Sequence, residues 1–184
     1  MPIKNSRRQY GSITKVLHWC IALVFAIQYY LVYWKHYVLP ENSELGGFYI
    51  RQLHKPIGVI ALLLALFVLA WKQFNTKPEY IGISSPWQKL AAYIVHMLLY
   101  ASILIMPLSG LLMSTASGYP INLFGLYELP LFLEKSKPLA KTCYTIHVYV
   151  SYLTIGLVAT HIGAALKHHF VDKNQVLMRM IPFK

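Results

Sequence analysis

Acidic side chains, and charge in general, are scarce in this chain. It has 184 residues, with six Asp and Glu against 17 Lys and Arg, and 12% of its residues are charged, whereas a soluble domain carries about 25%. The six acids all lie near predicted loops, and no G-x-S-x-G, H-E-x-x-H or Gly-rich phosphate loop occurs. These absences exclude the common hydrolase, zinc-protease and phosphate-loop sites.

Cysteine is scarce as well, since the chain holds only Cys20 and Cys143. Neither belongs to a C-x-x-C pair, and the topology predicted below puts them toward opposite membrane faces, too far apart for a disulfide. We therefore expect no redox-active cysteine pair, and both residues to serve as small packing residues of helices.

Long apolar runs are what the sequence has in abundance. Hydrophobic residues make up 57% of the chain, and the mean hydropathy is +0.47. Four runs are long enough to cross a bilayer, which takes about 20 residues of helix. The sequence predicts an all-α, integral membrane four-helix bundle that forms a single transmembrane domain over residues 1–184, with helices near residues 14–36, 52–73, 87–113 and 141–169.

Positive charge is divided unevenly between the two sides of this predicted bundle. Eleven Lys and Arg fall on the side of both termini, against six on the other side, which also holds four of the six acids. Because Lys and Arg concentrate in cytoplasmic loops, both termini are predicted to be cytoplasmic. The net charge of +11 is then explained by topology and lipid contacts, and no nucleic-acid partner is expected.

The connection over residues 114–142 is the one long loop, and it lies on the outer side. It contains two glycines and three prolines, which predicts irregular backbone or short turns. Since non-helical backbone avoids bare lipid, we expect this loop to lie at the interface and cap the bundle.

Four of the eight histidines fall at two matched depths of the predicted helices. His147 and His161 are 14 residues apart in one helix, so their side chains point within about 40° of each other, separated by a rise of roughly 21 Å. His54 matches the outer depth of His147, and His18 the inner depth of His161. Any one of them alone is more simply an interfacial or hydrogen-bonded core residue, but the matched set favours a function.

Imidazole pairs are the ligands that hold haem iron in electron-transfer cytochromes. Structural zinc needs three or four close ligands, often cysteines, and these histidines form separated pairs. The pattern therefore predicts two haems, the outer one between His54 and His147 and the inner one between His18 and His161.

His96 lies about ten residues into the predicted third helix, deep enough to need a partner. Three roles stay open for it: replacing His18 as the inner ligand, bonding a haem propionate, or handling a proton. His36 is predicted to be interfacial. His168 and His169 end the fourth helix, where positive charge is favourable, and no more than one of these neighbours faces the bundle.

Several stretches of the chain resemble the bacterial cytochrome b561 family, four-helix membrane cytochromes with two b-type haems. They are RQYGSITKVLHW, LHKPIG, VHMLLY with the P-x-S-G that follows it, and the tail ALKHHFVDKNQVLMRM, which is very like the family's A-L-x-H-H-F-x-D-K-x-x-x-L-x-R-M. The resemblance implies haem b ligation by His18, His54, His147 and His161, location in the bacterial inner membrane, and electron exchange with quinone as substrate.

The chain departs from the family pattern after its second-helix histidine. Many relatives carry arginines 14 and 18 residues further on, where this chain has Val68 and Lys72. Lys72 keeps a positive charge without the bidentate fork of arginine. We expect Lys72 and His96 to contact a haem propionate or the quinone.

The resemblance also implies the function. Some members resemble superoxide oxidases, so the expected function is electron transfer from a periplasmic-side donor, either superoxide or a periplasmic redox protein, to membrane quinone. This favours an oxidoreductase of the superoxide:quinone type. The alternative is a haem-bearing membrane-anchor subunit that takes electrons from a protein partner. Outer cations would attract superoxide by steering, unless nearby glutamates cancel their field and leave them ordinary solvated charges: Arg51, Lys55, Lys135, Lys137 and Lys141.

Overall fold

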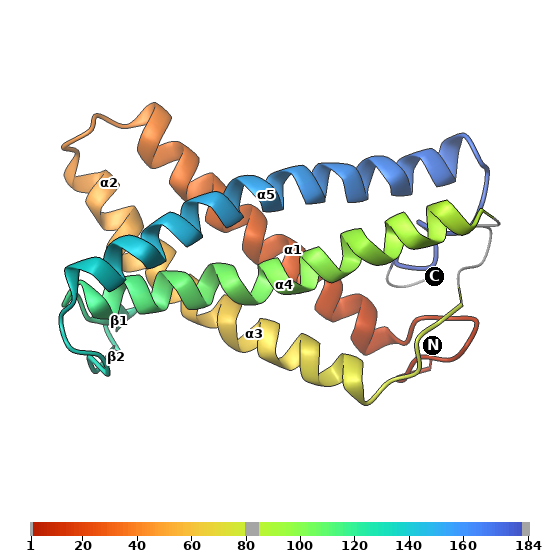
Figure 1. Ribbon diagram of the computed structural model, residues 1–184, viewed down its shortest axis with the longest axis horizontal. Helices are drawn as coiled ribbons and strands as arrows, with labels where there is room; N and C mark the ends of the chain where they lie inside the picture. The colour runs from red at the N-terminus through yellow and green to blue at the C-terminus, as the bar shows by residue number, and fades with distance from the viewer. Residues whose placement is uncertain (1, 80–84, 182–184) are drawn as a thin grey trace. The chain divides into compact units, whose positions relative to one another are not determined.

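The computed structural model describes residues 2–79 and 85–181 (Figure 1). Four helical segments are long and apolar enough to cross a membrane: Ser12–Val38, Glu44–Gln73, Pro86–Ala116 and Lys137–Phe170. The prediction of an all-α membrane protein with four spans is therefore confirmed. Large apolar side chains remain exposed along these helices, Leu63 for example by 62%, as expected for surfaces that face lipid rather than water.

The first two spans each contain a π-helical turn. Helix α1 (Ser12–Tyr33) continues into the π-helical segment Trp34–Val38. The second span begins with α2 (Glu44–Phe48), passes through the π-helical segment Tyr49–His54 and continues as α3 (Lys55–Gln73). It therefore begins well before residue 52, where the sequence predicted its start.

The early start of the second span has a local cause. The Ser43 side chain accepts a hydrogen bond from the Gly46 backbone N–H, which is the usual N-cap interaction. Glu44 in the first turn adds a favourable charge at the helix N-terminus. His54 thus lies inside a continuous helical segment and not near its first residue.

Helices α4 (Pro86–Ala116) and α5 (Lys137–Phe170) form the third and fourth spans. Pro86 occupies the first turn of α4, where a missing N–H costs nothing. A second proline, Pro107, lies inside α4, where it removes one hydrogen bond of the helix. Lys167, His168 and His169 lie in the last turn of α5, where positive charge is favourable.

The connection between α4 and α5 contains a small β-hairpin that the sequence did not predict. Strands β1 (Ile121–Leu123) and β2 (Tyr127–Leu129) pair antiparallel, with Ile121 opposite Leu129. The turn is possible because Gly125 adopts a positive φ of 79°, a conformation that costs glycine little. The irregular loop expected here is therefore partly regular.

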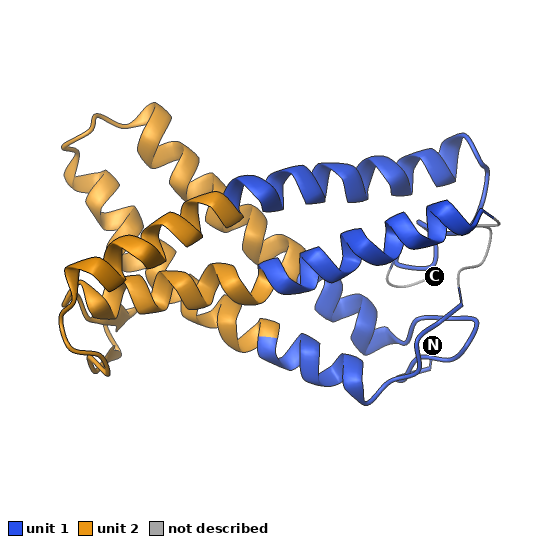
Figure 2. Ribbon diagram, viewed as in Figure 1, with its two compact units in different colours: residues 1–20, 66–102, 151–184 blue, residues 21–65, 103–150 orange. Residues whose placement is uncertain are grey.

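The chain divides into two compact units, shown in different colours in Figure 2. Unit 1 comprises Met1–Cys20, Leu66–Ser102 and Ser151–Lys184, and it contains His18, His96 and His161. Unit 2 comprises Ile21–Ala65 and Ile103–Val150, and it contains His54, His147 and the hairpin. Each histidine pair predicted from depth thus lies within one unit.

Within unit 1, the residues after α5 are attached to the start of the chain. Arg179 donates hydrogen bonds to the backbone carbonyls of Arg8, at 2.9 Å, and Glu79, at 3.0 Å. Its guanidinium also lies 5.3 Å from the Tyr10 ring centroid. Trp19 Nε1 donates to the Met180 carbonyl at 2.8 Å. The tail that resembles the family pattern therefore joins the residues after α5 to the start of the chain, and we call these contacts the clasp.

Replacing Arg179 by alanine is expected to lower the free energy of unfolding by roughly 1–2 kcal/mol, because two charge-assisted hydrogen bonds to carbonyls are lost at a partly exposed site. The measurement is thermal unfolding in detergent, together with limited proteolysis of the tail. The matched control is Arg7→Ala, which removes the same charge from an exposed side chain. Equal melting temperatures for the two variants would show that the clasp contributes nothing.

Candidate functional site

In unit 2, the rings of His54 and His147 lie next to each other and are nearly perpendicular. His54 ends the π-helical segment and His147 lies on α5, and their ring centroids are 6.2 Å apart. An imidazole nitrogen lies about 2.0–2.1 Å from a bound metal, and its ring centroid about 1.1 Å further, so two imidazoles on opposite sides of one ion have centroids roughly 6.3 Å apart. The observed separation therefore fits one ion between the rings.

The His147 ring is anchored on its other side by α4. Its Nδ1 lies 2.9 Å from the Met106 carbonyl oxygen and 3.2 Å from Ser109 Oγ. Because a carbonyl only accepts hydrogen bonds, Nδ1 carries the proton, and Nε2 keeps a free lone pair for a metal. Sequence reasoning missed both contacts, although the P-x-S-G segment that it singled out contains Ser109.

The His54 ring is less constrained by the protein. Its Nδ1 is buried and has no hydrogen-bond partner among the described residues, while its backbone carbonyl accepts a bond from Gln28 Nε2 at 2.9 Å. Buried ring nitrogens are seldom left without a partner. A metal ion bound to this nitrogen would remove the deficit, and the 6.2 Å ring separation leaves room for one, so the residues present fit a metal held by paired imidazoles.

Unit 1 contains the second pair at nearly the same separation. The ring centroids of His18, on α1, and His161, on α5, lie 6.0 Å apart. Both side chains are half-buried. This pair therefore also fits one metal ion between two imidazoles.

His96 also lies next to this pair. Its ring centroid is 5.1 Å from that of His161, with the rings nearly perpendicular, which is too short for an ion between them. His96 Nδ1 donates to the Ala92 carbonyl at 2.5 Å, so its Nε2 is the free acceptor. The geometry favours His18 over His96 as the partner of His161. Within residues 2–79 and 85–181, no three His, Cys, Asp or Glu side chains form a metal-binding group.

Lys72, on α3 in unit 1, is held against α4. Its Nζ lies 4.1 Å from the Tyr100 ring centroid and 3.8 Å from the Met97 sulfur. Tyr100 follows His96 by one helical turn, so the same side of α4 carries both residues. Val68 is half-buried and apolar and has nothing with which to replace the missing cation.

The remaining histidines lie outside the two pairs. His36 is exposed, and His169 Nδ1 is buried without a partner among the described residues. His168 is bonded to Asp172 at 2.7 Å and Lys167 to the same carboxylate at 2.8 Å. These bonds, chiefly the one from Lys167, hold the pKa of Asp172 below its ordinary value.

The predicted steering cations of unit 2 differ in environment. Lys55 is half-buried and donates to Ser114 Oγ at 2.8 Å. Its ammonium also lies 5.4 Å from the Tyr119 ring centroid. The other four are exposed: Arg51, Lys135, Lys137 and Lys141.

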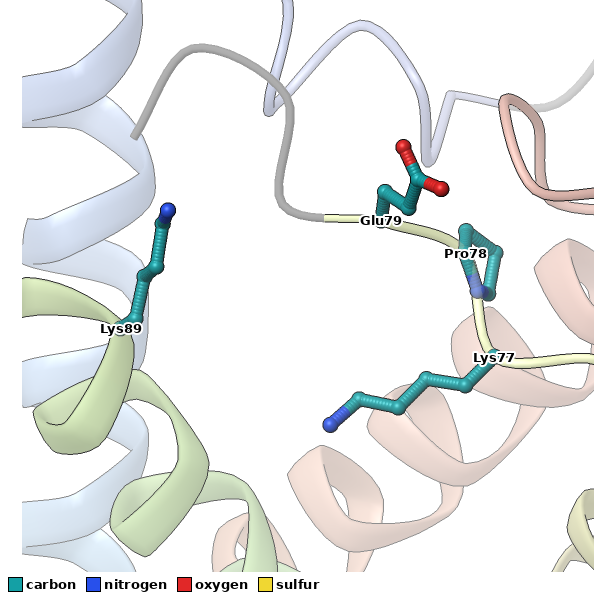
Figure 3. A pocket seen from close by; sticks show the side chains of 4 residues that line it. All are labelled: Lys77, Pro78, Glu79 and Lys89. Atoms are coloured by element: carbon teal, nitrogen blue, oxygen red, sulfur yellow. The ribbon is translucent and has the colours of Figure 1, made fainter. Parts of the chain in front are cut away.

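A separate cavity of about 460 Å³ is lined by Lys77, Pro78, Glu79 and Lys89 in unit 1 (Figure 3). None of its described lining residues is a histidine, so we assign this cavity no part in the chemistry of the histidine pairs.

Comparison with known proteins identifies the family of this chain. The family model described as prokaryotic cytochrome b561 matches residues 9–183. Cytochrome b561 homolog 2 of Escherichia coli K12 is 31% identical over 98% of this chain and 95% of its own length. Homolog 1 of the same strain is 30% identical over 90% of this chain and 93% of its length. A probable superoxide oxidase of Yersinia pestis is 23% identical over 96% of this chain and 98% of its length. The chain therefore belongs to the prokaryotic cytochrome b561 family, haem-carrying electron-transfer proteins that cross the bacterial inner membrane several times.

Proposed function

We propose that this chain binds two haem b groups and passes electrons from a donor at the His54–His147 pair to membrane quinone at the His18–His161 pair. The observation that carries the proposal is the presence, in each compact unit, of two imidazoles whose centroids lie 6.0–6.2 Å apart. The two imidazoles of each pair would hold the haem iron and leave it no open position, which suits electron transfer better than oxygen binding.

In each unit the protein's part is to hold and shield the redox group. His147 is fixed by its bond to the Met106 carbonyl, which leaves its Nε2 lone pair for a metal. The exposed apolar surface of the four spans keeps lipid, and not water, around the bundle. When bound, haem b supplies a one-electron iron couple whose potential is tuned by its ligands and their surroundings.

We further propose that the whole chain is one transmembrane domain with both termini in the cytoplasm. The charge asymmetry of the loops supports this orientation, with eleven Lys and Arg on the side of the termini against six on the other. The His54–His147 pair then lies toward the periplasm, and the His18–His161 pair toward the cytoplasm. Electrons would enter from the periplasmic side.

We propose superoxide as the electron donor. Two observations support it. Unit 2 carries six Lys and Arg against four Glu, with Arg51 and Lys55 close to His54 in sequence, and the chain is similar to a relative that is itself described as a probable superoxide oxidase. Superoxide is a small anion, so positive charge near the entry point raises its local concentration and its rate of reaction. One electron leaves each superoxide, which becomes O₂.

We propose that quinone accepts the electrons next to Lys72 and His96. Lys72 supplies a positive charge that favours a partly reduced headgroup, and its contact with Tyr100 keeps it against α4. His96 has a free Nε2 acceptor, because its Nδ1 is engaged with Ala92. Full reduction of a quinone takes two electrons and two protons, so a hydrogen-bonding imidazole at this position is chemically useful.

The test is rapid mixing of the purified holoprotein with superoxide while haem absorbance is followed, with a soluble ubiquinone analogue as acceptor. We expect fast haem reduction by superoxide, followed by reoxidation on addition of quinone. If superoxide does not reduce the haem and the protein is isolated with a redox partner, the chain is instead the membrane-anchor subunit. Haem that is reduced but never reoxidised by quinone would contradict the acceptor.

Electrostatic steering of superoxide by the cations of unit 2 leads to a separate prediction. The rate of haem reduction by superoxide is expected to fall at least about threefold between low and high ionic strength, because salt screens the attraction of an anion to positive charge. The double variant Lys135→Gln, Lys137→Gln should show a lower rate and a weaker salt dependence. The matched control Lys4→Gln, Arg7→Gln removes two charges from the side of the termini and should leave the rate unchanged. A rate independent of salt would rule out steering.

A further inference from the structure

One turn of α4 contacts the His147 ring and holds it in place, and we call this turn the seat. The segment runs from Met106 to Gly110 and contributes three groups: the Met106 carbonyl, the Ser109 hydroxyl and the Gly110 backbone. Ser109 is 5% exposed and Met106 is 9% exposed, so this contact is shielded from solvent. All of these residues belong to unit 2.

The two polar groups of the seat act together on Nδ1. The Ser109 hydroxyl donates to the Met106 carbonyl at 2.9 Å, so its proton is engaged and its oxygen lone pairs are free to accept. The His147 Nδ1–H therefore meets two acceptors, the carbonyl at 2.9 Å and the hydroxyl oxygen at 3.2 Å. Acceptors on this side of a ligating histidine fix its tautomer and ring orientation and make it a more basic ligand.

Gly110 provides the space in which the ring lies. A Cβ at this position would be 3.1 Å from Cε1 and 3.3 Å from Nδ1 of His147. Those contacts are tighter than ordinary carbon packing, and the ring would have to move away from its two acceptors. Glycine is needed here for close approach, not for an unusual backbone conformation.

The other pair has no such arrangement. Among the described residues, the rings of His18 and His161 make no hydrogen bonds, and their contacts are those with neighbouring aromatic rings. The seat on α4 therefore distinguishes the unit 2 pair chemically from the unit 1 pair, although the two pairs have nearly equal ring separations.

We propose that Ser109 is a positioning residue for His147: with Gly110, it sets the orientation and donor strength of this imidazole, and thereby the reduction potential of the haem bound in unit 2. This inference rests on the proposed function, since it requires a haem between His54 and His147. Removing an acceptor from Nδ1–H weakens electron donation by the ring to iron, which favours the reduced state and raises the potential.

The test is a redox titration of the holoprotein with Ser109→Ala, combined with electron paramagnetic resonance of the oxidised haems. One midpoint potential should rise while the other stays fixed, by an amount equal to about a threefold to tenfold change in the ratio of oxidised to reduced iron, or roughly 30–60 mV for one electron. The resonance of one low-spin haem should shift as its ring turns. Ser109→Thr keeps the hydroxyl and should restore both signals.

The matched control is Thr115→Val. Thr115 is also buried on α4 and also donates to a carbonyl of its own helix, that of Leu111, but it does not contact His147. This variant should leave both potentials unchanged. Equal shifts in Ser109→Ala and Thr115→Val would mean a general loosening of α4 and would overturn the proposal, as would two unchanged potentials in Ser109→Ala.

Gly110→Ala gives an independent readout. It should cost one haem or strongly alter its resonance, whereas Gly163→Ala, at a position with open space around the added Cβ, should keep both haems. A Gly110→Ala protein with two unaltered haem signals would contradict the seat. Wild-type protein that carries no haem in unit 2 would instead refute the proposed function, so the two failures can be told apart.

Discussion

Replacing His147 by alanine is expected to halve the haem content, from two haems per chain to one. Among the described residues, the His147 imidazole lies next to His54 at the separation that an ion between two rings requires, and haem b would be held chiefly by the two imidazoles. The pyridine haemochrome assay, normalised to protein, measures the loss directly. The haem that remains should keep the low-spin spectrum of a bis-imidazole iron.

The matched control for this prediction is His36→Ala. His36 is exposed at the end of the first span, so its replacement removes an imidazole without touching either pair. We expect it to keep two haems per chain. A His147→Ala protein that also keeps two haems would remove His147 from the ligand set, and one that loses all haem would mean that the two sites do not bind independently.

The second large effect distinguishes His18 from His96. His18→Ala is expected to lose one haem, because its ring lies 6.0 Å from that of His161. His96→Ala is expected to keep both, because its ring lies only 5.1 Å from His161 and its Nδ1 is engaged with Ala92. The assay is again haem per protein, read together with the spectrum of the bound haem.

The reverse outcome would change the ligand assigned beside His161. Loss of a haem in His96→Ala with full content in His18→Ala would make His96 the ligand and leave His18 as its neighbour. We expect His96→Ala instead to slow reoxidation by quinone, because it removes the Nε2 acceptor that we place at the quinone site. That rate is measured with the haems already reduced, so it does not depend on the donor.

The sequence was sufficient for the four spans because hydrophobic length is a local property. Each span is a run of apolar residues long enough for a bilayer, and the structure has a helix over each run. Local signals were also present at the start of the second span, where Ser43 caps the helix, but the apolar run alone placed that start too late. The hairpin was missed because two strands of three residues give almost no period to detect.

The histidine pairs could be predicted because residues on different membrane-spanning helices can be compared by their depth along the membrane normal. His147 and His161 are 14 residues apart. This spacing is close to four full turns of an α-helix, so both side chains lie on the same face. The structure brings His54 to His147 and His18 to His161. Their role as haem ligands stays a prediction until haem is measured.

Contacts that depend on how side chains of different helices meet could not be predicted. Ser109 and His147 are 38 residues apart, and nothing in the sequence around either one specifies their hydrogen bond. The P-x-S-G segment resembles the family pattern, but that resemblance does not indicate which side chain Ser109 contacts. Likewise, the bonds of Arg179 to the carbonyls of Arg8 and Glu79 involve backbone atoms, which carry no signal in the sequence.

We propose that each compact unit holds one haem b between two imidazoles, and the haem content and spectrum of the purified protein test this. The pyridine haemochrome assay should give two haem b per chain, and electron paramagnetic resonance of the oxidised protein should show two low-spin signals. One haem per chain would remove one of the two sites, and protein without any Soret absorbance after expression with sufficient haem would contradict haem binding at both pairs.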